Sequence, residues 1–110
     1  MNLAVETWGS GDDRGIALKG ELDLATTATV ERELRRMESE SPKRITIDLR
    51  GLGFIDSTGL RVIVQADERA RGDGRRLSLI AGPEAVHRVF EITLLHDRLD
   101  FVEAPEGEAP

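Results

Sequence analysis

The chain has 110 residues, of which 39% are hydrophobic and 33% are charged. This length and composition fit a single domain that buries its own core, and they exclude a disordered chain. Cysteine is absent, so disulfides, thiolate metal ligands and cysteine nucleophiles are excluded. The net charge of −6 argues against non-specific nucleic-acid binding, which requires a basic surface. We expect a cytoplasmic protein without membrane contact, because no apolar run approaches the roughly 18 residues that span a bilayer.

The beginning of the chain predicts an antiparallel hairpin. Two short runs of strand-forming residues occupy positions 3–8 and 16–20. Glycine, serine and aspartate fill positions 9–13 between them, which is the composition of a tight turn.

The segment from Asp23 to Ser41 predicts an amphipathic helix. Val30, Leu34 and Met37 recur at helical spacing, and charged residues fill the other faces. A proline follows at position 42 and ends the helix, because proline cannot continue the helical hydrogen-bond pattern.

A strand and a glycine-containing loop follow. Positions 45–49 alternate apolar and polar residues, which predicts a strand with one face buried and the other facing solvent or a partner. Asp48 lies on the polar face, and we expect it to be solvated. Positions 51–56 contain two glycines and predict a loop that Phe54 and Ile55 anchor.

The remaining elements alternate between helix and strand. In chain order the pattern first predicts a helix over 57–71, with an inner stripe of Leu60, Ile63 and Val64 and with Asp67 outside. A strand over 77–80 follows, and then a helix that Gly82 and Pro83 open, with an inner face of Val86, Val89 and Phe90. A last strand is predicted over 99–102. This order, ββαβαβαβ, predicts an α/β fold with a mixed, mostly parallel sheet and helices packed on one face. We expect one domain over residues 1–102 and an acidic, flexible tail over 103–110.

The most informative segment for function is Asp56-Ser57-Thr58-Gly59, at the start of the second predicted helix. The first turn of a helix leaves backbone amides unpaired, and the helix dipole favours negative charge there. The domain would therefore tolerate a phosphate on the Ser57 hydroxyl, whereas a docked partner would meet an added charge of about −1.5 to −2. From these residues alone, an inert N-cap role for Ser57 is the simpler interpretation.

Two segments resemble the STAS family, specifically the bacterial anti-sigma factor antagonists. The segment Gly20-Glu21-Leu22-Asp23 is similar to the family's loop after the second strand. The segment Phe54-Ile55-Asp56-Ser57-Thr58-Gly59-Leu60 is similar to the family's phosphorylation loop and the start of the next helix. The likeness extends from about Leu3 to Val102, because the predicted element order also matches.

The resemblance implies partner switching, a form of transcription regulation in bacterial stress responses. An unphosphorylated antagonist binds an anti-sigma factor serine kinase, a histidine-kinase-like ATPase, and so frees a sigma factor. The kinase phosphorylates the serine that matches Ser57, the complex dissociates, and a serine phosphatase reverses the change. By the same match, Asp23, Asp56, Thr58 and Gly59 would line the partner-binding surface. We expect no catalytic residue, no cofactor, and a monomer or weak dimer.

Some positions keep a second interpretation or depart from the family pattern. Asp23 is also suited to a turn or to the N-cap of the first helix, which is compatible with partner contact. Thr58 is a minor competing phosphate acceptor. Many relatives have Thr-Gly-Leu after the third helix, but this chain has Thr93-Leu94-Leu95. A glycine there usually takes the left-handed conformation that ends a helix, so the end of the third helix is undetermined.

Other functions find weaker support in the sequence. His87 and His96 have no acidic or thiol partner at ligand spacing, so we expect two surface residues and no metal site. Ser57 lacks the Gly-x-Ser-x-Gly context of a hydrolase nucleophile, and no complete dinucleotide-binding glycine motif is present. The stronger alternative stays within the same fold: a scaffold of a stress-sensing assembly, or a cytosolic partner subunit of a transporter, without kinase control.

Overall fold

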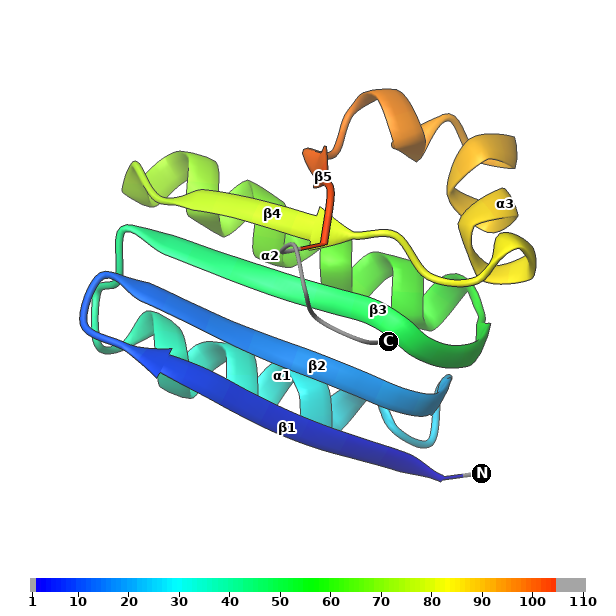
Figure 1. Cartoon of the computed structure of the whole chain (residues 1–110), viewed down its shortest axis with the longest axis horizontal. Coiled ribbons are helices and arrows are strands. Elements are labelled where there is room, and N and C mark those ends of the chain that lie inside the picture. The colour runs from blue at the N-terminus through cyan, green and yellow to red at the C-terminus, as the bar shows by residue number, and fades with distance from the viewer. Residues whose placement is uncertain (1, 105–110) are drawn as a thin grey trace.

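The strands form one mixed sheet with helices packed against it (Figure 1). The computed structural model describes residues 2–104. In chain order the elements are β1 (Leu3–Ser10), β2 (Asp13–Leu22), α1 (Thr27–Glu38), β3 (Arg44–Ile55), α2 (Ser57–Asp73), β4 (Arg76–Ile80), α3 (Glu84–Ile92), the 3₁₀ helix η1 (Leu95–Asp97) and β5 (Phe101–Val102). The five strands follow the order β1-β2-β3-β4-β5; β1 is antiparallel to β2, and all other neighbours are parallel. The predicted α/β fold and element order are confirmed. The tail predicted over 103–110 lies, from residue 105 on, outside the described residues.

The predicted hairpin is present, and both strands are longer than expected. β1 pairs with β2 along the whole length of β1, from Leu3 opposite Gly20 to Ser10 opposite Asp13. Gly11 in the connecting turn has a φ of 65°, a left-handed conformation that glycine adopts without steric cost.

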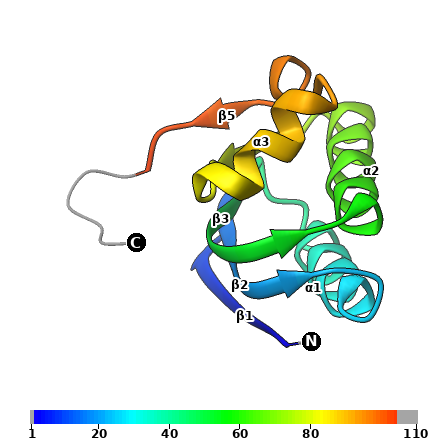
Figure 2. The same cartoon turned by 90° about the vertical axis from the view of Figure 1, so that its right-hand side faces the viewer.

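Two of the helices cover one face of the sheet, and the third packs against β3 (Figures 1 and 2). The predicted stripe of Val30, Leu34 and Met37 on α1 is fully buried. Aliphatic side chains of the central strands complete this core: Ile16, Leu18, Ile45, Ile47, Leu49, Leu77 and Leu79. Full burial of each such side chain favours folding by about 1.5–3 kcal/mol, so the sheet and its helices are held mainly by this contact.

The buried stripe of α2 is wider than expected, because α2 packs against α1 as well as against the sheet. Val62, rather than Val64, is buried on the inner face. Asp67, which we expected outside, is buried, and its carboxylate accepts a hydrogen bond from Arg71 at 2.9 Å.

The glycine-containing segment 51–56 is not the predicted loop, because β3 continues as a strand to Ile55. β2 extends alongside it, with Gly20 opposite Leu52 and Leu22 opposite Ile55, so the backbone of this segment has hydrogen-bonding partners. The register shifts at Gly20, where a φ of 118° requires glycine. Ile55 is buried as an anchor, but Phe54 is 45% exposed.

Asp48 is not solvated as expected; it is only 9% exposed. Arg50, two residues further along the strand and therefore on the same sheet face, donates two side-chain hydrogen bonds to it at 3.0 and 2.8 Å. Burial raises the pKa of Asp48, but hydrogen bonds and charge from Arg50 outweigh it, and the net pKa is lowered. The alternating pattern identified the polar face correctly but could not show that its charges pair with each other.

The end of α3 keeps the geometry expected for a glycine, although a leucine stands there. Pro83 precedes the helix as its N-cap, and Val86 and Phe90 are buried while Val89 is half-buried. Leu94, two residues after the helix, has φ 64° and ψ 12° in the left-handed region. Leu94 therefore adopts the left-handed turn expected for a glycine, at the cost of backbone strain.

The two histidines are not separate surface residues. Their ring centroids lie 4.9 Å apart, and both rings contact Phe101 of β5. His96 is exposed as expected, but His87 is half-buried, and its Nδ1 has no hydrogen-bond partner within residues 2–104. The prediction for His87 was wrong because α3, η1 and β5 converge on its ring. No helix among these residues is both long and apolar enough to cross a bilayer.

Candidate functional site: the loop before α2

Two strand-to-helix connections lie side by side where β2 and β3 end (Figure 2). One is the turn from Asp23 to Thr26 before α1, and the other is Asp56 before α2. The backbone amide of Asp56 donates a hydrogen bond to the carbonyl of Leu22 at 3.2 Å, which joins the two connections. The sheet therefore brings together the two segments on which the sequence resemblance rests.

Asp56 is the N-cap of α2. Its carboxylate accepts hydrogen bonds from the backbone amides of Thr58 and Gly59 at 2.9 and 3.0 Å, and from the Thr58 hydroxyl at 2.5 Å. The Thr58 side-chain bond is the main cause that lowers the pKa of Asp56, and the amides of Gly59, Thr58 and Leu24 lower it further. Asp56 is thus a fixed negative charge that satisfies the free amides of the first helical turn.

Ser57 is the first residue of α2, and it is exposed. The inert N-cap role weighed for Ser57 is taken by Asp56 instead, since the capping bonds come from the aspartate. Within residues 2–104 the Ser57 hydroxyl makes no hydrogen bond, whereas the Thr58 hydroxyl is bonded to Asp56. The two adjacent hydroxyls therefore differ in accessibility, and Ser57 is the one open to a reagent.

Gly59 positions this loop by close packing. A Cβ atom at this residue would lie 2.8 Å from Leu22 Cγ, 2.9 Å from the Leu22 carbonyl oxygen and 3.0 Å from Ile55 Cγ1. Gly59 is buried, so any contribution to partner contact is indirect, through the placement of Ser57.

Asp23 holds the neighbouring turn. One carboxylate oxygen accepts from the Ala25 amide at 3.0 Å and from the Thr26 hydroxyl at 3.2 Å. Its backbone carbonyl accepts from the amides of Thr26 and Thr27. Asp23 is 8% exposed and Thr26 is the N-cap of α1, so the structure supports the turn interpretation over the N-cap interpretation for Asp23.

Two exposed apolar side chains beside this site were missed by the sequence reasoning. Leu24 follows Asp23 in the turn and is 75% exposed. Phe54 lies opposite Glu21 near the end of β3 and is 45% exposed. The signal for Leu24 was its position among turn-forming residues, where no core is available to bury it. Phe54 could not be assigned because the strand that sets its orientation was expected to be a loop.

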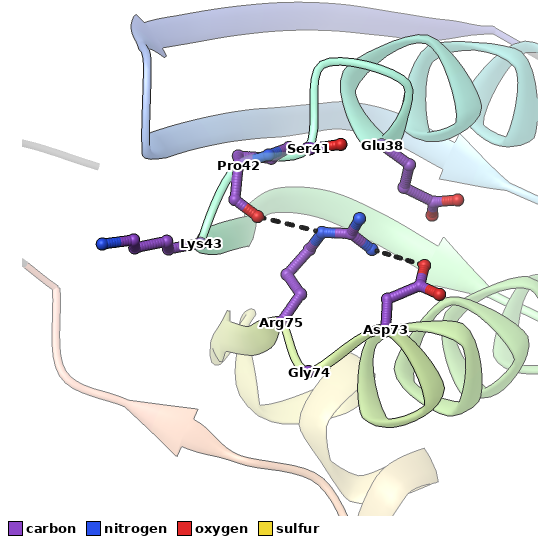
Figure 3. A pocket seen from close by; sticks show the side chains of 7 residues that line it. All are labelled: Glu38, Ser41, Pro42, Lys43, Asp73, Gly74 and Arg75. Atoms are coloured by element: carbon purple, nitrogen blue, oxygen red, sulfur yellow. Dashed lines mark hydrogen bonds and ion pairs between the residues drawn. The ribbon is translucent and has the colours of Figure 1, made fainter.

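A pocket of about 430 Å³ lies at the opposite end of α2 (Figure 3). Its lining residues are Glu38, Ser41, Pro42, Lys43, Asp73, Gly74 and Arg75. Arg75 donates hydrogen bonds to the Pro42 carbonyl at 3.2 Å and to the Asp73 carboxylate at 3.3 Å. Ser57 begins α2 and Asp73 ends it, so about 24 Å of helix separates this pocket from the Ser57 loop.

The exposed hydroxyl of Ser57 can accept a phosphoryl group without disturbing the core, since it lies outside the bonds of the cap. Negative charge at this position is compatible with the positive end of the α2 dipole. No group of three or more potential metal ligands occurs within residues 2–104.

A family model described as "Mlab, STAS domain" matches residues 7–103. The chain belongs to the STAS domain family. A curated STAS relative, the anti-sigma-B factor antagonist of Staphylococcus epidermidis, is 31% identical over 108 residues, which cover 98% of this chain and 100% of that protein.

Solved structures of anti-sigma factor antagonists share the fold. An anti-sigma factor antagonist from Mycobacterium paratuberculosis superposes with a TM-score of 0.84 at 19% identity, covering 94% of this chain and 87% of that one. The anti-sigma factor antagonist SpoIIAA in its unphosphorylated form gives 0.78 at 20% identity, covering 96% and 90%. SpoIIAA of Bacillus in its phosphorylated form gives 0.72 at 19% identity, covering 96% and 93%.

Proposed function

We propose that this STAS domain is an anti-sigma factor antagonist whose binding to an anti-sigma factor serine kinase is controlled at Ser57. In the unphosphorylated state it occupies the kinase and so releases a sigma factor. The kinase transfers the γ-phosphoryl group of ATP to the Ser57 oxygen; the hydroxyl proton is released and ADP leaves. The modified chain dissociates, and a serine phosphatase hydrolyses the phosphate to restore the hydroxyl.

The observation that carries the proposal is the exposed, unbonded hydroxyl of Ser57 at the first position of α2. It is placed by bonds that do not involve it, because Asp56 caps the helix and Gly59 packs against β2. The similarity to anti-sigma-B factor antagonists supports the same assignment, and SpoIIAA, which has the same fold, has a phosphorylated form.

The partner surface is proposed to centre on this loop. Leu24 and Phe54 offer apolar contact beside Ser57, where Asp23 and Asp56 fix the backbone. Docking that buries Ser57 would desolvate the phosphate and leave it without a counter-charge from the partner. Burying a charge that the partner does not bind costs about 2–5 kcal/mol, which is roughly 30- to several-thousand-fold in affinity.

The test compares binding of the serine kinase to the wild-type chain and to Ser57→Glu and Ser57→Ala, by isothermal titration calorimetry. Ser57→Glu is expected to weaken binding at least roughly 30-fold, because it places a charge in the interface. Ser57→Ala is expected to bind like the wild type, since it adds no charge to the loop. Melting temperatures of both variants should stay close to that of the wild type, because Ser57 is exposed and makes no hydrogen bond among the described residues.

Ser10→Glu is the matched control. Ser10 is also an exposed serine, but it lies beside the hairpin turn at the opposite end of β2 from the Ser57 loop. The Ser10→Glu variant adds the same charge outside the proposed interface, so it should bind the kinase like the wild type. Equal affinities for Ser57→Glu and Ser10→Glu would contradict the proposal.

The second candidate is a STAS scaffold or transporter partner subunit without kinase control. The matching family model has a description different from the names of the curated relatives, which favours keeping this alternative. It predicts stable association with a partner that does not phosphorylate Ser57. Purification of the chain with its natural partner, followed by identification of that partner, separates the two functions.

A further inference from the structure

Arg61 lies one helical turn after Ser57 on α2, and both residues are exposed. Residues four apart on a helix lie on the same face, with about 5–6 Å between their Cβ atoms. The guanidinium of Arg61 is therefore within side-chain reach of any group attached to the Ser57 oxygen.

Arg61 differs from the other arginines of α2 in its pairing. Arg69 forms a bidentate pair with Glu38, with both bonds at 2.9 Å, and Arg71 bonds Asp67 at 2.9 Å. Arg61 forms no ion pair or hydrogen bond through its side chain within residues 2–104. Its guanidinium is thus free of any partner among the described residues of the unmodified chain.

The helix itself offers Arg61 no carboxylate at the favourable spacings. The positions three and four residues away hold Thr58, Ser57, Val64 and Gln65, so the partners available there are two hydroxyls and two uncharged side chains. Of the two hydroxyls, the one on Thr58 is already bonded to Asp56. A phosphate on Ser57 would supply the anion that this arginine lacks.

We propose that Arg61 pairs with phosphorylated Ser57 and holds the phosphate against the surface of α2. The inference rests on the proposed phosphorylation of Ser57 and adds a residue that acts only on the modified state. Guanidinium groups bind phosphate oxygens through paired N–H donors, which gives the contact geometric specificity. Phosphorylation then changes two exposed features of the docking surface: it adds the phosphate and removes the free cation of Arg61.

The test needs no kinase, because phosphoserine can be installed at position 57 during translation. The second pKa of the phosphate, ordinarily near 6, is then measured by ³¹P NMR titration. Arg61 favours the dianion, so the phosphate pKa in the wild-type background should lie below that in Arg61→Gln by about 0.1–0.4 unit. The difference should shrink in about 1 M salt, which screens the pair.

Two control variants make the result specific. Arg61→Lys keeps the charge and should keep most of the lowering, although it loses the paired donors. Arg71→Gln removes the same charge at a position about 21 Å along the helix from Ser57 and should leave the phosphate pKa unchanged. Any contribution of the helix dipole is common to all variants and cancels in the comparison.

Equal phosphate pKa values in the wild type and Arg61→Gln would overturn the pairing. That result would leave the kinase-binding test of Ser57 untouched. Conversely, a kinase that never modifies Ser57 would contradict the proposed function, while the pKa difference could still be measured. The two failures are therefore distinguishable.

Discussion

At the scale of single residues, Leu94 combines two unfavourable features. Its backbone is left-handed, with φ at 64°, and its side chain is 71% exposed. The left-handed conformation costs an L-residue about 1–2 kcal/mol, and leucine gains nothing by burial here. The neighbouring Thr93 amide and hydroxyl both donate to the Val89 carbonyl, at 3.2 and 2.7 Å, so the end of α3 is fixed before the chain reaches this residue.

We expect Leu94→Gly to raise the free energy of unfolding by about 0.5–1 kcal/mol. Relief of the strain exceeds the extra conformational entropy that glycine loses on folding, about 0.5–1 kcal/mol. Urea denaturation monitored by circular dichroism measures the difference. Leu94→Ala is the control, because it removes the exposed side chain but retains the Cβ atom and the strain. If alanine stabilises as much as glycine, the strain is not the cause.

Some properties of Ser57 and Asp48 could be predicted from the sequence, and others could not. The position of Ser57 at a helix start could be predicted, because helix starts follow from local signals. It could not be predicted that Asp56 rather than Ser57 caps the helix, since both are good N-cap residues and only the backbone geometry decides between them. The pairing of Asp48 with Arg50 was missed for a related reason: strand alternation tells which face a residue occupies and not what lies beside it.

At the scale of elements, the placement of Ser57 depends on how closely α2 approaches β2. Gly59 permits that approach, because a Cβ atom there would meet the backbone and side chain of Leu22 within 3.0 Å. The start of α2 is therefore set by a contact between two elements as well as by its own cap.

Gly59→Ala is expected to destabilise the domain by about 1–3 kcal/mol, because the added methyl group overpacks the junction of α2 with β2. Gly72→Ala on the same helix is the matched control, since nothing lies within 4 Å of a Cβ atom there. That change should leave stability equal or slightly higher, as alanine is the better helix former. Chemical denaturation of both variants measures the contrast, and similar losses in the two would contradict the packing role.

Element order was predictable from the sequence because periodicity and turn residues report it directly. The hairpin, the helices and the alternation that follows were all recognised from the spacing of apolar residues. The end of β3 could not be predicted, because its glycines are typical of a loop. Only the pairing with β2 shows that this segment is a strand. Leu24 and Phe54 became visible as exposed neighbours of Ser57 only once that pairing was established.

At the scale of the whole molecule, the proposed switch leaves the fold unchanged. The core is formed by side chains of the sheet and of α1, α2 and α3, while the Ser57 hydroxyl lies outside it. The proposed partner surface is built from the ends of β2 and β3 and the turns that follow them. Phosphorylation at this edge would therefore change recognition through local charge, with Arg61 as the proposed internal partner of the phosphate.

The most direct measurement is phosphate mapping by mass spectrometry after incubation of the chain with ATP, magnesium and each candidate histidine-kinase-like anti-sigma factor. The account predicts one phosphate, on Ser57, from one kinase among those tested, and none on Ser57→Ala. Modification of Thr58 or of any other residue in place of Ser57 would contradict the assigned site. No phosphate from any of these kinases would contradict the antagonist function and favour the partner-subunit alternative.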